Sequence, residues 1–168
     1  VGTRQMTAYG RMITRLIAHQ LVSNGANIIS GFMYGVDLCA QQTALEKNGY
    51  TLGVLGYGFD HVFPAAHQAI MVEMLQTGRA CFISEYPPYT RPTKGTFPRR
   101  NRLIAGLSLG VVVTEAGPRS GTQITVKYAL ENGRDVFAVS GPVTSIYHEG
   151  VKKIINQGAI LVGSGVAV

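Results

Sequence analysis

The stretch NIISGFMYGVDLCAQQTALEKNGYTLGVL, Asn27 to Leu55, decides the fold. Its first four residues form the short, β-branched apolar run that is typical of a buried strand. SGFMYGVD follows as a glycine-rich loop, Asp37–Lys47 is expected to be helical, and TLGVL (Thr51–Leu55) is a second apolar run. A strand, a helix and a second strand in this order predict a βαβ unit with two parallel strands.

The same alternation continues on both sides of this unit. Helices are expected at Thr7–Asn24, Ala65–Gln76, Arg99–Leu107, Thr122–Asn132 and Val151–Asn156, and strands at Ala80–Ser84, Gly110–Ala116, Asp135–Val139 and Ala159–Val162, with Gly2–Arg4 at the end of a first strand. Strands that are apolar throughout are typical of a parallel sheet covered on both faces. The sequence therefore predicts one α/β domain over residues 1–168, with an open, mainly parallel sheet and helices on both faces.

The net charge of the chain indicates which class of binding partner it favours. The chain has 168 residues, a formal charge of +6 and a pI near 9.6, a balance that favours a polyanion such as nucleic acid, a nucleotide or an acidic membrane surface. Cys39 and Cys81 have no metal-ligand spacing, so we expect reduced cysteines in a cytoplasmic protein, with no metal and no cofactor. We expect no signal peptide, and no apolar run is long enough to span a bilayer.

The positive charge is concentrated ahead of one predicted helix, in and before TFPRRNRLIAGLS (Thr96–Ser108). No acidic residue lies between Glu85 and Glu115. Five of the fifteen basic residues do lie there: Arg91, Lys94, Arg99, Arg100 and Arg102. Single-stranded nucleic acid is held by a positive groove together with aromatic faces on which bases stack. Because Phe97 lies among these charges, the segment predicts such a site.

The loops that follow the predicted strands are suited to phosphate. They are GTR (Gly2–Arg4), SGFMYGVD (Ser30–Asp37), LGYGFD (Leu55–Asp60) and EAGPRSGTQIT (Glu115–Thr125). Glycine after a strand is usually turn chemistry, but four such loops meet at the edge of a parallel sheet where ligands bind. Neither a P-loop nor a full GxGxxG fingerprint is present, which excludes a Walker-type NTPase and an ordinary dehydrogenase.

Taken in order, these motifs resemble the DNA-processing protein A family (DprA, also called Smf). The resemblance rests on GTR, SGFMYGVD, VLGYGFDHVFP, SEYPP, FPRRNRLIAGLS, VVVTEAGPRSGTQIT, GRDVFAVSG and a closing GA-I-LV, and it spans essentially the whole chain. It implies an extended Rossmann-like domain that binds single-stranded DNA without catalytic turnover. It also implies a homodimer, formed through the C-terminal third, that helps to load a RecA-type recombinase during natural transformation.

The resemblance also implies a set of site residues. Phe97 would stack a base, and Lys94 and Arg4 would hold phosphates. The full set expected to bind DNA or its phosphates is Gly2, Thr3, Arg4, Ser30, Gly31, Lys94, Phe97, Arg99, Arg100, Asn101, Arg102, Ser120, Gly121 and Thr122. Structural alternatives stay open at three of these positions. Phe97 could pack against the helix that follows it, and Asn101 and Arg102 could cap that helix or tie the loop to the sheet.

The chain departs from the family pattern in one glycine loop, where Met33 and Tyr34 replace the family's Ala-Arg pair and so remove one phosphate partner. Two other functions are alternatives to DNA binding. Nucleotide phosphoribohydrolases of the same wider fold carry paired glutamates where this chain has Ile124 and Thr125. A nucleotide-binding sensor needs the phosphate pocket but not the basic segment Arg91–Arg102, and this segment favours a single strand.

Overall fold

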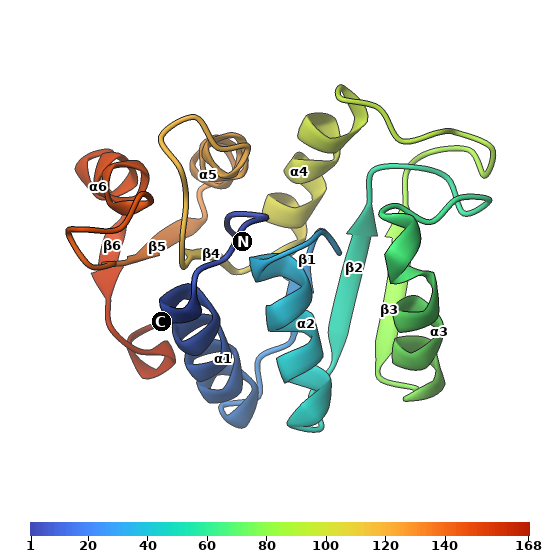
Figure 1. Ribbon diagram of the computed structural model, residues 1–168, viewed down its shortest axis with the longest axis horizontal. Helices are drawn as coiled ribbons and strands as arrows, with labels where there is room; N and C mark the ends of the chain where they lie inside the picture. Colours follow the sequence, from blue (N-terminus) through green and yellow to red (C-terminus); the bar gives the residue numbers. More distant parts are fainter.

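The computed structural model describes residues 1–168 as alternating helices and strands (Figure 1). The helices are α1 (Ala8–Ser23), α2 (Val36–Glu46), α3 (Gln68–Gln76), α4 (Thr96–Leu107), α5 (Thr122–Glu131) and α6 (His148–Asn156), with 3-10 turns at Ala65–His67 and Gly165–Ala167. The strands are β1 (Ile28–Ser30), β2 (Thr51–Leu55), β3 (Ala80–Ser84), β4 (Gly110–Val113), β5 (Asp135–Val139) and β6 (Ile160–Val162). The predicted α/β class is confirmed.

All strand pairs are parallel, as predicted, but the strands form two sheets rather than one. Their orders are β1-β2-β3 and β4-β5-β6. The amino-terminal residues run beside β4 without forming a strand: the Val1 amino group donates to the carbonyl oxygen of Val112 at 2.9 Å, and the Thr3 amide donates to that of Glu115 at 2.8 Å. A cavity of about 640 Å³, with apolar side chains in most of its lining, is bordered by residues of α1, β1 and β4.

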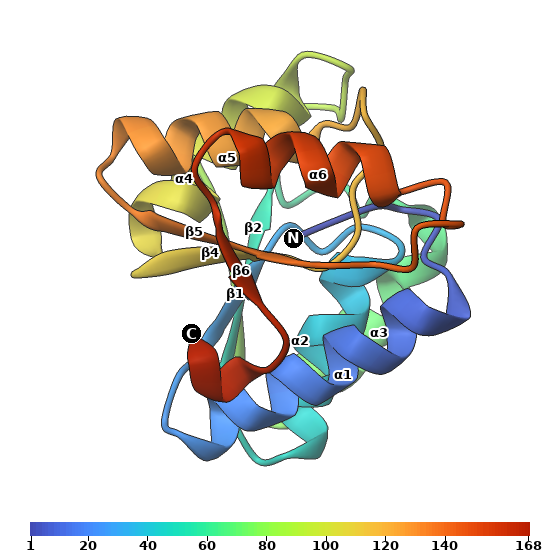
Figure 2. The ribbon, with the colours of Figure 1, turned by 90° about the vertical axis from the view of Figure 1, so that its left-hand side faces the viewer.

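Helices cover both faces of the strands, also as predicted. Figure 2 shows α4, α5 and α6 on one side of the sheets and α1, α2 and α3 on the other. Ile13 and Ile17 of α1 are buried against Phe137 and Val139 of β5. Each such isoleucine contributes about 1.5–3 kcal/mol when fully buried. No helix in the protein is both long enough and apolar enough to cross a membrane.

The boundaries of α1 follow the expected end signals. The Thr7 hydroxyl accepts a hydrogen bond from the Gly10 amide at 3.0 Å and caps the start of the helix. Asn24 caps its end, and Gly25 follows with φ of +85°, a conformation that favours glycine. The predicted range Thr7–Asn24 therefore contains the helix together with both of its caps.

Two boundaries differ from the prediction in ways that matter for function. The helix expected from Arg99 begins at Thr96, because Thr93 and Thr96 exchange hydrogen bonds ahead of it and its first turn tolerates Pro98. The strand expected to reach Ala116 ends at Val113. Beyond it, the buried Glu115 side chain accepts a hydrogen bond from the Thr7 amide at 3.0 Å, which ties this loop to the start of α1.

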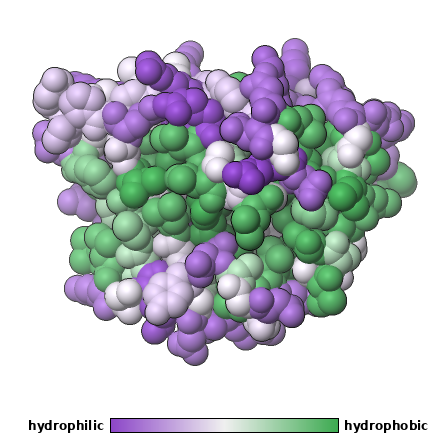
Figure 3. Space-filling model, turned by 180° about the vertical axis from the view of Figure 1, so that it is seen from behind, coloured by the Kyte–Doolittle hydropathy of each residue, from purple (hydrophilic) through white to green (hydrophobic).

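Within each sheet the strands are parallel, and the loops that follow β2, β3 and β4 lie along the upper edge of the molecule in Figure 1. Seen from behind, this edge is predominantly polar, whereas the centre of the back face is apolar (Figure 3). Ligands of open parallel sheets bind at the carboxyl ends of the strands. A ligand site is therefore expected at the polar edge.

Candidate nucleic-acid interface

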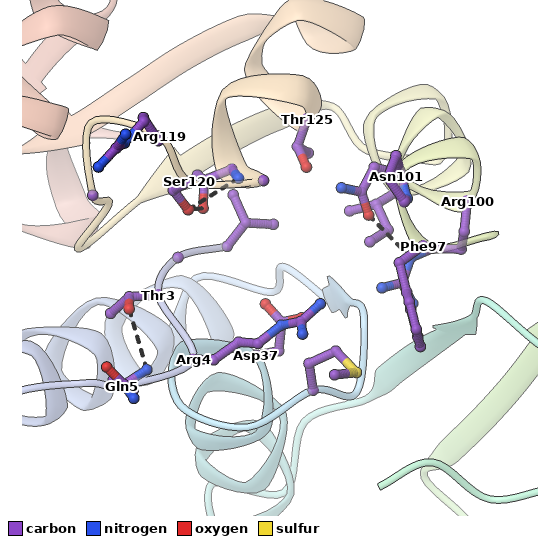
Figure 4. Close-up of a pocket in the computed structure, with 18 of the residues that line it drawn as sticks. Thr3, Arg4, Gln5, Asp37, Phe97, Arg100, Asn101, Arg119, Ser120 and Thr125 are labelled. Carbon is purple, nitrogen blue, oxygen red and sulfur yellow. Dashed lines mark hydrogen bonds between the residues drawn. The ribbon is translucent and has the colours of Figure 1, made fainter. Parts of the chain in front are cut away.

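A pocket of about 880 Å³ opens at this edge of the molecule. Three segments build most of it: the amino-terminal residues Val1–Gln5, the start of α4, and the loop that leads into α5 (Figure 4). Of the residues predicted from the sequence, those in its lining are Gly2, Thr3, Arg4, Lys94, Phe97, Arg100, Asn101, Ser120, Gly121 and Thr122. The fold thus brings together segments that are about a hundred residues apart in the chain.

Phe97 forms the aromatic centre of the α4 wall. Its ring is half-buried, with its centroid 5.5 Å from that of Phe63 and 6.4 Å from that of Tyr57. The Arg4 guanidinium carbon lies 5.6 Å from the Phe97 ring centroid, which is within cation–π range. Phe97 therefore packs against the loop after β2, a partner that the structural alternative of packing against the following helix did not name, and it also presents part of its ring to the pocket.

Arg100 is buried and holds the pocket together from behind. Its Nη1 donates to the carbonyl oxygen of Gly31 at 2.8 Å and also to that of Val54, so the side chain joins α4 to the ends of β1 and β2. Its Nε donates to Asn101 Oδ1 at 3.1 Å. Burial lowers the pKa of the Arg100 guanidinium, and the nearby Asp37 carboxylate opposes that shift. The sequence predicted a DNA contact here, whereas these hydrogen bonds assign Arg100 a positioning role within the lining.

Ser30 and Gly31 lie behind the pocket rather than in its lining. Ser30 is buried, and its hydroxyl has no hydrogen-bond partner. A side chain at Gly31 would begin 2.6 Å from Arg100 Nη2 and 2.7 Å from Asp37 Oδ2. Glycine is therefore required at this position by the packing of the protein itself. A contact of Ser30 or Gly31 with DNA has no support in this geometry.

Arg99 and Arg102 are exposed on α4 and lie outside the pocket lining. Arg102 forms an ion pair with Glu85, at the end of β3. This contact ties α4 to the residue that follows β3, which is a structural role like the tie to the sheet that the alternative for Arg102 named. Arg99 forms no ion pair, so its charge is free at the surface close to the pocket.

The opposite wall consists of the loop before α5 and offers small polar groups. The Ser120 and Thr122 hydroxyls lie 2.9 Å apart, and the Thr122 amide donates to Ser120 Oγ at 3.2 Å. A side chain built at Gly121 would meet no atom within 4 Å. Neither α4 nor α5 has an acidic residue in its first turn. Their positive amino-terminal dipoles are therefore uncompensated and favour an anion in the pocket.

The electrostatic balance of the lining is positive. Arg4, Lys94 and Arg119 reach the pocket from three different segments, and Asp37 is the one acidic residue in its lining. Figure 4 shows Arg119 with Ser120 on one side of the cavity, and Phe97 with Asn101 on another. Glu115, the acid closest in sequence to the loop before α5, is buried against Thr7 and does not line the pocket.

Sequence reasoning missed the contributions of Phe63 and Tyr147 to the lining. Phe63 lies in the loop after β2, and its signal was the aromatic residue in the VFP motif. Tyr147 is buried, and its hydroxyl donates to the carbonyl oxygen of Gln5. Gln5 and Tyr147 are 142 positions apart, so no local pattern could have paired them.

The fold and the pocket define a Rossmann-like α/β protein with a basic, aromatic-walled pocket at the carboxyl ends of its strands. Within that class, residues 1–167 match the model of the DNA recombination-mediator protein A family, and the chain belongs to this family. This result confirms the resemblance to DprA and Smf proteins found in the sequence.

Relatives within the family show the same relationship. Protein Smf of Escherichia coli is 43% identical over 162 residues, which cover 96% of this chain and 43% of that protein. The structure of DNA processing protein A from Streptococcus pneumoniae matches with a TM-score of 0.90 and 38% identity, covering 99% of this chain and 58% of that one.

A second solved structure is that of DNA processing protein A from Helicobacter pylori, described for its single-stranded DNA binding mode. It matches with a TM-score of 0.88 and 30% identity, covering 99% of this chain and 75% of that one. The chain spans about half the length of the curated relatives that it matches, such as the 53% of the Bacillus subtilis DNA processing protein DprA.

Proposed function

We propose that this domain binds single-stranded DNA in the cytoplasm during natural transformation, without catalytic turnover, and that it helps to load a RecA-type recombinase. The observation that carries the proposal is the convergence of Phe97, Lys94 and Arg4 on one pocket that has a single acid in its lining. The H. pylori relative, whose structure is described for single-stranded DNA binding, supports the same ligand.

A single strand fits these groups better than a duplex does. Aromatic rings bind bases through stacking, and bases are available for that only when they are not stacked within a duplex. Arg4 lies near the Phe97 ring and Lys94 lines the same pocket, so both can supply charge for the phosphates beside a stacked base. The free backbone amides at the start of α5 and the Ser120 and Thr122 hydroxyls add uncharged hydrogen-bond donors for phosphates of the same DNA strand.

The hydrolase alternative has little chemistry to support it. Cleavage of a glycosidic bond needs carboxylates as acid, base or stabilising group. Glu115 is committed to Thr7, and Asp37 lies against Gly31 and Arg100 at the back of the pocket. A small nucleotide could still use the phosphate groups of the α5 wall, so the test of the proposal includes this ligand.

The test is fluorescence anisotropy with labelled oligo-dT over a salt series, with unlabelled duplex DNA and mononucleotides as competitors. The proposal predicts salt-dependent binding that neither competitor displaces, because phosphate contacts release counterions and stacking needs free bases. Displacement by a mononucleotide would instead identify a nucleotide sensor. Lys152→Ala, at an exposed lysine of α6, is the matched control for Lys94→Ala.

We also propose a homodimer through the C-terminal third of the chain. Its edge strand β6 exposes Ile160 and Leu161, and exposed apolar edge strands favour pairing with another chain. Sedimentation equilibrium tests the proposal: Leu161→Glu should shift a dimer towards monomer. If the unmodified chain remained monomeric at all concentrations, the proposed dimer would be wrong.

A further inference from the structure

Two loops beside the pocket display three exposed aromatic rings, only one of which also lines the pocket. Residues 56–64 follow β2 and residues 85–90 follow β3, and both loops project from the same end of the molecule (Figure 1). We call their three exposed rings, Phe59, Phe63 and Tyr89, the aromatic ledge. The exposed fractions of these residues are 54%, 38% and 75%, so each of them leaves apolar surface that a ligand could bury.

The ledge is held on a rigid frame. The Gly58 amide donates to the carbonyl oxygen of Thr90 at 2.9 Å, and the Asp60 amide donates to that of Pro88 at 3.0 Å. Beneath them, the Ser84 hydroxyl donates to the carbonyl oxygen of Tyr57 at 2.7 Å. These bonds join the two loops into one unit, so the rings are displayed on a preformed surface and need no ordering before they bind a ligand.

The ledge begins where the pocket ends. Phe63 belongs to both, because it lines the pocket and its ring centroid lies 5.5 Å from that of Phe97. The chain that carries Tyr89 continues within a few residues to Pro92, Thr93 and Lys94, which also line the pocket. A strand that leaves the pocket past Phe97 therefore meets Phe63 next, with Phe59 and Tyr89 on the same frame.

The charge around the ledge favours the same ligand as the pocket. Arg91, Lys94 and Arg99 are exposed in the chain that follows Tyr89, and Glu85 is already paired with Arg102. Asp60 is then the one acidic residue of the two loops that forms no ion pair. Rings bordered by unpaired cations match a single strand of nucleic acid, in which bases alternate with phosphates.

We propose that the aromatic ledge is a second part of the single-strand site, which stacks bases of the strand after it leaves the pocket. This inference rests on the proposed function, and it adds two residues, Phe59 and Tyr89, that lie outside the pocket. It predicts that a long oligonucleotide gains affinity from contacts that a short one cannot reach.

The test compares oligo-dT of increasing length on the unmodified chain and on the double variant Phe59→Ala, Tyr89→Ala. The variant should bind the shortest oligonucleotide that occupies the pocket as the unmodified chain does, but should bind a long one about tenfold or more weakly, as expected for lost base stacking. Tyr50→Ala is the matched control, because Tyr50 is 58% exposed and precedes β2 at the opposite edge of the sheet.

The outcomes separate the two proposals. If the unmodified chain bound neither short nor long oligonucleotides, the proposed function would fail, and the ledge proposal with it. If short binding persisted but the double variant lost nothing on long oligonucleotides, or lost the same factor on both lengths, only the ledge proposal would be overturned. Thermal unfolding of each variant checks that the fold is kept.

Asp60→Asn gives a second test in the opposite direction. Removing this unpaired carboxylate should strengthen binding of long oligonucleotides about two- to fivefold, the size expected for one exposed charge, and should leave short ones unchanged. A fall in affinity for long oligonucleotides would contradict the proposed path of the strand.

Discussion

The two walls of the pocket face each other but offer different chemistry. The α4 wall acts through long side chains, among them Lys94 and Phe97, whereas the α5 wall offers the small hydroxyls of Ser120 and Thr122 and the open backbone at Gly121. Side-chain truncation should therefore remove binding groups from the first wall, whereas the second wall should respond mainly to added bulk. Variants of the α4 wall are therefore expected to have larger effects than variants of the α5 wall.

The largest expected effect is on stability and comes from Arg100, which anchors the α4 wall. Arg100→Met leaves the buried carbonyl oxygens of Gly31 and Val54 without their donor, and we expect a loss of about 2–5 kcal/mol in the free energy of unfolding. Urea denaturation measures it. Arg99→Met, at the exposed neighbour, should change stability by only about 0.5 kcal/mol or less. Similar values for both variants would contradict the positioning role of Arg100.

The second effect is on binding through Phe97. Phe97→Ala should weaken oligo-dT binding by about 1–3 kcal/mol while keeping the salt dependence, because stacking is lost and phosphate contacts remain. Anisotropy at several salt concentrations measures both quantities. If the variant unfolded instead, the contacts of Phe97 with Tyr57 and Phe63 would be its main role.

The third effect separates charge from stacking in the same pocket. Lys94→Ala and Arg4→Ala should each weaken binding and reduce the slope of log affinity against log salt by about 0.7, the value for one phosphate contact with a single strand. The same salt series measures this slope, with Lys152→Ala as the control. An unchanged slope would show that these side chains do not contact phosphates.

The smallest effect compares two glycines. Gly121→Ala should leave stability unchanged or raised by about 0.5 kcal/mol, because its new methyl group meets no protein atom within 4 Å. Any weakening of oligo-dT binding then reports a strand that approaches the α5 wall. Gly31→Ala should destabilise the protein, because the methyl group would begin 2.6 Å from Arg100 Nη2. Urea denaturation and anisotropy distinguish the two results, and equal stability for both variants would contradict the assignment of Gly31 to packing.

The sequence predicted the order and type of the elements because each depends on local signals. α1 shows this best, since apolar spacing, Thr7 and Gly25 all act within one segment. It did not predict that the strands would divide into two sheets, because the separation of β1 from β4 depends on contacts between distant parts of the chain.

The candidate site was predicted in outline for the same reason. The basic segment, Phe97 and the glycine loops can be recognised in the sequence. The different surroundings of the Arg99, Arg100 and Arg102 side chains cannot. Successive residues of a helix point about 100° apart, so one of these arginines meets solvent, one meets carbonyl groups and one meets Glu85. The carbonyl partners of Arg100 lie 46 and 69 residues away in the chain.

The most direct test of the account is an NMR titration of the chain with oligo-dT, read at the backbone amides of both walls. We predict that the amides of residues 93–97 and those of Gly117 and residues 119–121 shift together, at one stoichiometry, because one strand lies between the two walls. Shifts confined to residues 117–121 would indicate a nucleotide-sized ligand on the α5 wall alone, and they would contradict the proposal that the pocket holds a single strand.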